Sequence, residues 1–196
     1  MCATLRKHWD VTRAVPPVVP GNAYHGTATA GVCASRPCPA VLTGASVDAA
    51  FWARVPKQPT VVVESPRWSV VKRKANGRVD FISPLPTPFN YGCIPDIQSG
   101  DGDPLDAVVL GPRLPAGMRI QAPMVAVVDF WDNGEPDPKV VCSTHPFSAV
   151  DRAQLVAFFT LYAQAKRALW LVRGRKGKTA FCGFLPRETW RPNTNL

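Results

Sequence analysis

Acidic residues are concentrated in one stretch of this chain, and that concentration restricts how the chain can fold more than any other feature. Eight of the 14 acidic residues in the 196-residue sequence lie between Asp96 and Asp137. Carboxylates that share one site repel one another unless a cation offsets their charge. The stretch is therefore a first indication of bound metal.

Two short motifs inside this stretch carry most of the acids. Asp101-Gly102-Asp103-Pro104-Leu105-Asp106 places three carboxylates within six residues, and such oxygen clusters suit hard divalent cations. It is not an EF-hand loop, because Leu105 occupies a ligand position and the terminal Glu is absent. In the second motif, residues 132–139, a strand would point Asp137 and Lys139 to one face. Either motif alone could be an ordinary solvated turn.

Together the motifs favour phosphoryl transfer to water. Carboxylates facing one cavity would hold several Mg²⁺ ions, which neutralise phosphate oxygens and lower the pKa of a bridging water. A carboxylate not occupied by metal can accept the proton of that water. Lys and Arg side chains then bind the leaving phosphate.

Short β-branched runs separated by turn residues predict a mainly β (α+β) fold. Asn76-Gly77 stands between two such runs and favours a β-hairpin. The remaining runs indicate a small closed or partly closed sheet; the expected strands cover residues 61–64, 68–74, 78–83, 107–110, 124–130 and 140–142. We expect a short helix over residues 47–52 and a long C-terminal helix from Ser148 to Gly174 that packs on the sheet.

Length and composition favour one compact domain, which we place at residues 46–172. Residues 1–45 lack periodicity and are expected to be a disordered leader, a transit segment or the product of an early start codon. Residues 173–196 are expected to be a basic tail. No apolar run approaches the roughly 20 residues of a membrane span, and six dispersed cysteines indicate reduced thiols. We expect a cytoplasmic protein, with organelle targeting as the alternative.

The net charge of +9 raises the alternative of a nucleic-acid-binding module. Basic residues in Arg173–Lys178 could neutralise backbone phosphates. However, residues 173–196 hold six Lys or Arg and one Glu, and residues 1–50 hold four Lys or Arg and two acids, which leaves +2 for the middle. The acidic cluster there would repel a polyanion without metal, so nucleic acid is the less favoured partner.

The order and spacing of the motifs resemble those of family I soluble inorganic pyrophosphatases from residue 61 to about residue 172. The resemblance rests on Pro88-Phe89-Asn90-Tyr91-Gly92-Cys93-Ile94-Pro95, Asp101–Asp106, Leu110-Gly111-Pro112 and Asp132–Lys139. It implies a small OB-like closed β-barrel with a long C-terminal helix packed on it. It also implies hydrolysis of inorganic pyrophosphate to two phosphates, several Mg²⁺ ions per site and a homo-oligomer.

The same resemblance implies roles for individual residues. Four carboxylates would hold metal ions: Asp101, Asp106, Asp132 and Asp137. Asp103 would be the general base. Lys72, Lys139 and Tyr162 would contact phosphate oxygens. Tyr91 and Glu64 would support the site from its edge.

Four positions depart from the family pattern. The family usually has an acid, an arginine, a tyrosine and a lysine where this chain has Lys74, Phe81, Thr87 and Ala163. We hypothesise that Lys166, one helical turn after Tyr162, and Arg73 or Arg78 replace the missing cations. The departures also support an alternative, a catalytically impaired pyrophosphatase-like protein that binds phosphate or a protein partner.

Overall fold

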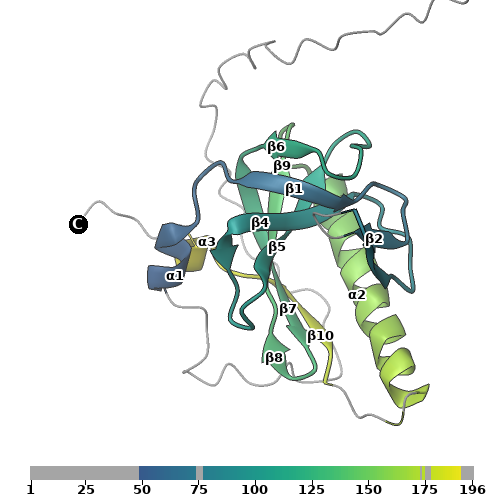
Figure 1. The fold of residues 1–196 in the computed structure, drawn as a ribbon. Coiled ribbons are helices and arrows are strands. Elements are labelled where there is room, and N and C mark those ends of the chain that lie inside the picture. Colours follow the sequence, from purple (N-terminus) through teal and green to yellow (C-terminus); the bar gives the residue numbers. More distant parts are fainter. Residues whose placement is uncertain (1–48, 74–76, 173, 175–177, 191–196) are drawn as a thin grey trace, which may run out of the picture. The chain divides into compact units, whose positions relative to one another are not determined.

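The computed structural model describes residues 49–73, 77–172, 174 and 178–190, and Figure 1 shows their arrangement. The expected leader at residues 1–45 lies outside the described residues. The helices are α1 (Ala49–Arg54), α2 (Ala149–Val172) and α3 (Arg187–Trp190). The strands are β1 (Thr60–Ser65), β2 (Val71–Arg73), β3 (Val79–Ile82), β4 (Asn90–Gln98), β5 (Pro104–Leu110), β6 (Arg119–Gln121), β7 (Met124–Asp132), β8 (Glu135–Pro136), β9 (Lys139–Ser143) and β10 (Ala180–Phe184).

An eight-stranded sheet forms the centre of the fold. Its strand order is β10-β7-β9-β5-β4-β1-β6, and β8 pairs with β7. Every pairing is antiparallel except that of β5 with β9, which is parallel. The mainly β (α+β) prediction is confirmed. The closed barrel is not seen among the described residues, because the short edge strands β6 and β10 do not pair with each other.

Both faces of this sheet are buried. Successive residues of β5 alternate between two core clusters, since neighbouring side chains of a strand point to opposite faces. Ala107 and Val109 pack in the cluster that contains Trp52 of α1 and Trp190 of α3. Val108 packs in the other cluster, with side chains of α2. Burial on two faces explains why residues 107–110 of β5 form a continuous apolar run and not an alternating one.

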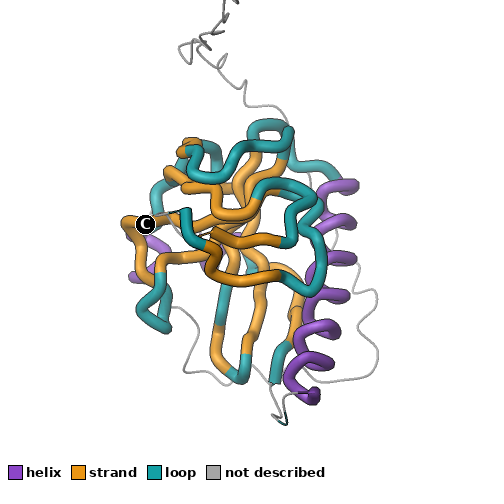
Figure 2. Tube along the Cα trace, turned by 45° about the vertical axis from the view of Figure 1, so that its right-hand side comes forward, coloured by secondary structure: helices purple, strands orange, loops and turns teal. Residues whose placement is uncertain are grey.

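The long helix α2 covers one face of the sheet, as the tube in Figure 2 shows. Ser148 and Asp151 cap its start reciprocally: Ser148 Oγ accepts from Asp151 N, and the Asp151 carboxylate accepts from Ser148 N. Its buried side chains are Leu155, Phe158, Phe159 and Ala163. The predicted C-terminal helix is thus confirmed. By length and composition alone α2 could also cross a membrane, but the same test is passed by helices that pack on a core.

The predicted hairpin is present and stands apart from the main sheet. Strands β2 and β3 pair antiparallel, with Lys72 opposite Phe81. Gly77 has a φ of 79°, a conformation that glycine adopts readily. Residues 74–76 between the two strands, including Lys74, lie outside the described residues.

The C-terminal segment differs from the expected basic tail over residues 173–196. Within it, β10 pairs antiparallel with β7 and forms an edge of the sheet. Helix α3 follows and buries Trp190 in the core. The physical reason is the apolar run Ala180–Phe184, which has the length and composition of an edge strand although basic residues precede it. Cys182 in β10 is disulfide-bonded, which corrects the expectation of reduced thiols at this position.

The Asn-Tyr-Gly motif at the start of β4 fixes this strand against its neighbours β1 and β5. The Asn90 side chain is fully buried: its Oδ1 accepts from Arg67 N and Leu114 N, and its Nδ2 donates to Pro112 O. A Cβ atom on Gly92 would lie 1.9 Å from the carbonyl oxygen of Val62 in β1, so only glycine fits there. The two flanking residues are therefore structural, and they fix β4 so that Tyr91 lines a cavity.

Candidate active site

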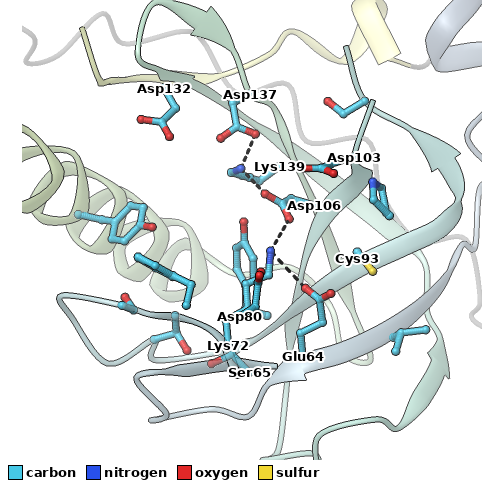
Figure 3. Close-up of a pocket in the computed structure, with 18 of the residues that line it drawn as sticks. Glu64, Ser65, Lys72, Asp80, Cys93, Asp103, Asp106, Asp132, Asp137 and Lys139 are labelled. Atoms are coloured by element: carbon cyan, nitrogen blue, oxygen red, sulfur yellow. Dashed lines mark hydrogen bonds and ion pairs between the residues drawn. The ribbon is translucent and has the colours of Figure 1, made fainter. Parts of the chain in front are cut away.

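The eleven residues predicted to act in catalysis, metal binding or substrate binding, apart from the alternatives Arg73 and Arg78, line a single cavity of about 650 Å³. They come from separate elements, and Figure 3 shows most of them pointing into the same space. Strands β1, β2, β4, β5, β7 and β9, the turns before β5 and β9, and α2 contribute them: Glu64, Lys72, Tyr91, Asp101, Asp103, Asp106, Asp132, Asp137, Lys139, Tyr162 and Lys166.

Lys139 is the most deeply placed cation of the site. Its buried ammonium group lies 2.5 Å from Asp106 Oδ2 and 2.5 Å from Asp137 Oδ1 (Figure 3). The parallel pairing of β5 with β9 sets this contact, because Ala107 lies opposite Val140 and the preceding residues are Asp106 and Lys139. Burial opposes the charged form, but the two carboxylates outweigh it and raise the pKa of Lys139.

Asp106 is the carboxylate with the most cationic surroundings. Lys72 reaches it from the hairpin at 3.5 Å and also lies 3.3 Å from Glu64. Burial favours the neutral acid, but the charges of Lys139 and Lys72 outweigh it, and hydrogen bonds from Lys139 and Tyr91 assist, so the pKa of Asp106 falls to about 2. Burial raises the pKa of Glu64 despite the opposing charge of Lys72.

Asp132 is held at both carboxylate oxygens. Oδ2 pairs with the ammonium group of Lys166 from α2. Oδ1 accepts a hydrogen bond of 2.9 Å from the hydroxyl of Thr179. Burial acts against ionisation, but the Lys166 contact and the Thr179 hydrogen bond lower the pKa of Asp132. Sequence reasoning missed Thr179, because it lies in the segment expected to be a tail.

Asp101 and Asp103 lie on the turn before β5 and are exposed at the cavity. Asp101 Oδ1 accepts a hydrogen bond from Asp103 N at 3.0 Å, and Gly102 between them has a φ of 86°. Ser99 N donates to Asp103 O at 2.7 Å and closes the turn. No ion pair between described residues includes either aspartate. Of the five predicted aspartates, these two are therefore the ones whose carboxylates no described lysine or arginine pairs with.

The donor chemistry of the cavity fits a hard divalent cation. Its carboxylates are all oxygen donors, which Mg²⁺ prefers. Among the described residues, however, no group of three or more potential ligands is close enough to hold an ion. Lysine ammonium groups stand between the carboxylates instead, and they supply the positive charge that the acidic stretch requires.

Two of the four departures from the expected pattern line the cavity. Phe81 and Thr87 line it, whereas Ala163 is buried in the core against the sheet. Of the cations proposed as replacements, Lys166 lines the cavity. Arg73 does not, because it is exposed and donates to Gly77 O, and Arg78 is not among the lining residues either.

Arg119, on β6, lines the cavity, although the sequence gave no reason to select it. It lies outside every motif, and the long-range pairing of β6 with β1 brings it to the site. No local sequence signal was available to find it.

Comparison with known proteins gives one family. A family model described as inorganic pyrophosphatase matches residues 61–176, more than half of the chain. An inorganic pyrophosphatase from Aeropyrum pernix is 37% identical over 111 residues, which cover 52% of this chain and 58% of that protein. One from Saccharolobus solfataricus is 30% identical over 140 residues, which cover 60% of this chain and 81% of that protein.

The same family is found among solved structures. The inorganic pyrophosphatase of Helicobacter pylori superposes with a TM-score of 0.55 at 25% identity. The match covers 74% of this chain and 89% of that one. The sequence match to the Aeropyrum pernix protein, by contrast, spans less than two thirds of that relative's length.

Proposed function

Because this chain belongs to the inorganic pyrophosphatase family, we propose that it hydrolyses inorganic pyrophosphate to two phosphates. The observation that carries the proposal is the convergence of six aspartates, the five predicted ones and Asp80, and three lysines on one cavity. Alternating acids and ammonium groups suit a substrate rich in anionic oxygens that arrives with cations. The proposal places the reaction in this cavity.

The proposed division of labour follows the contacts of the side chains. Mg²⁺ ions, held by Asp101, Asp106, Asp132 and Asp137, would neutralise phosphate oxygens and lower the pKa of water when bound. Asp103 accepts a proton from the attacking water, because its carboxylate is not engaged by a described lysine or arginine.

The phosphate oxygens are bound by cations and hydroxyl groups on the cavity wall. Lys72, Lys139 and Lys166 supply ammonium donors, and Tyr162 supplies a hydroxyl donor. Burial raises the pKa of Tyr162 to about 12, so this hydroxyl keeps its proton at neutral pH. Tyr91 and Glu64 position Asp106 and Lys72 respectively.

The proposal includes finer features of the family. We propose a catalytic domain that begins at residue 46, extends past residue 172 to include β10 and α3, and is preceded by a leader at 1–45. We also propose an OB-like barrel, a homo-oligomer and a cytoplasmic location. Light scattering after size-exclusion chromatography tests the oligomer directly.

The function is tested by measuring phosphate release from pyrophosphate with and without Mg²⁺. We expect release that requires the metal. The observation that favours the alternative, a protein that binds phosphate without turnover, is that Phe81 and Thr87 line the cavity where the family has an arginine and a tyrosine. Phosphate binding by well-folded protein without release would establish that alternative.

Lys166→Ala is expected to raise KM for pyrophosphate about 10–100-fold at saturating Mg²⁺. Lys166 lines the cavity beside Tyr162, and a lost charged hydrogen bond of about 1.5–3 kcal/mol corresponds to that change. Steady-state kinetics on both proteins provide the measurement. Gln164→Ala, at an exposed position of the same helix, is the matched control. An unchanged KM in Lys166→Ala would remove Lys166 as the replacement cation.

A further inference from the structure

A threonine beyond the matched family region contacts the acidic site. Thr179 follows the last residue of the family match, residue 176, and precedes β10. Its side chain is fully buried, and its hydroxyl donates to Asp132 Oδ1 at 2.9 Å. An ionised carboxylate can only accept hydrogen bonds, so the threonine is the donor in this contact.

The backbone around Thr179 is fixed by its neighbours. Arg167 Nε on α2 donates to Thr179 O at 2.5 Å. One residue earlier, Lys178 O accepts from Gly134 N at 2.9 Å. One residue later, Ala180 lies opposite Trp131 in the ladder of β10 with β7. The hydroxyl is thereby held at a set position relative to the end of β7, which carries Asp132.

The two oxygens of Asp132 have partners of different kinds. Oδ2 faces the ammonium group of Lys166, and a cation that enters the cavity would repel this group. Oδ1 faces a neutral hydroxyl, which can keep its hydrogen bond while the carboxylate binds a cation. Hydrogen bonds of this kind orient the carboxylates that bind metals. The hydrogen bond from Thr179 is therefore compatible with a cation bound at Oδ2, whereas the ion pair with Lys166 is not.

We propose that Thr179 is a positioning residue, which holds Asp132 so that Oδ2 is presented to a divalent cation in the cavity. This inference rests on the proposed function, because it assumes that Asp132 is a metal ligand. It extends the active site to a C-terminal segment outside the family match.

The test compares Thr179→Val, which removes the hydroxyl at similar volume, with Thr179→Ser, which retains it. Mn²⁺ binding to the substrate-free protein is measured by electron paramagnetic resonance and titration calorimetry. We expect Thr179→Val to weaken one class of Mn²⁺ site about 10–100-fold and Thr179→Ser to bind nearly as the wild type. Thr160→Val, at an exposed position on α2, is the matched control and should bind Mn²⁺ unchanged.

Two results would overturn the inference: wild-type Mn²⁺ affinity in Thr179→Val, or equal weakening in the valine and serine variants. If Thr179→Val does not fold, Arg167→Met removes the bond to the Thr179 carbonyl and should weaken Mn²⁺ binding measurably; unchanged binding there is equally decisive against it. Wild-type protein that binds no Mn²⁺ would reject the proposed function as well, so the two failures are distinguishable.

Discussion

Asp103→Asn is expected to reduce phosphate release from pyrophosphate about 10²–10⁴-fold, the range of a lost general base. The amide has nearly the same shape as the carboxylate but cannot accept a proton from water. Asp103 is exposed on its turn, and its backbone, not its side chain, holds the turn together. The fold should therefore be unaffected. Release is measured at saturating Mg²⁺ on proteins of matched thermal stability.

The control for this variant is Asp96→Asn, at an exposed position of β4 outside the cavity lining. Like Asp103→Asn, it replaces one exposed carboxylate with an amide. It should retain full activity. Near wild-type release in Asp103→Asn would assign the proton to another group. Loss of Mn²⁺ binding in the same variant would make Asp103 a metal ligand instead.

Lys139→Met is expected to destabilise the metal-free protein by about 3–5 kcal/mol, the cost of breaking a buried ion pair by removing one partner. Lys139 is the shared cation between Asp106 and Asp137. Without it, the two carboxylates repel each other in a largely buried setting, and Asp106 keeps its ion pair with Lys72. The free energy of unfolding is measured by urea titration in the presence of a chelator.

Added Mg²⁺ should restore more stability to Lys139→Met than it adds to the wild type. A ligand that binds only the folded state stabilises it in proportion to its affinity, and the variant no longer holds an ammonium group that competes with the ion. Arg113→Met, at an exposed position outside the cavity lining, is the control and should change little. Equal gains from Mg²⁺ in variant and wild type would show that the lysine does not compete with metal.

Local motifs identified acidic residues that the fold brings to one cavity. Asp101–Asp106 and Asp132–Lys139 each bring their own acids together within a few residues. The spacing of Asp137 and Lys139 correctly predicted that they lie side by side, although the strand begins only at Lys139. The resemblance added Glu64, Lys72 and Tyr162, which no local pattern connects to the acids.

Contacts between distant segments could not be predicted. Thr179 reaches Asp132 across 47 positions, and a lone threonine among basic residues has no distinguishing pattern. Residues 173–196 were interpreted from their basic residues as a tail, so the apolar run Ala180–Phe184 was not predicted to form a strand. The expected closure of the sheet likewise depended on pairings between its edges, which the periodicity of single strands does not specify.

The two contacts to Asp132 come from Lys166 and Thr179, which follow all the strands from β1 to β9 in the sequence. A ribosome makes these residues after every strand from β1 to β9 has been translated. Domains fold in the order of synthesis where their contacts allow it, so most of the sheet can pair before this carboxylate has acquired either partner. The nascent chain thus passes through a stage in which the strands of its central sheet exist but its acidic centre is incomplete.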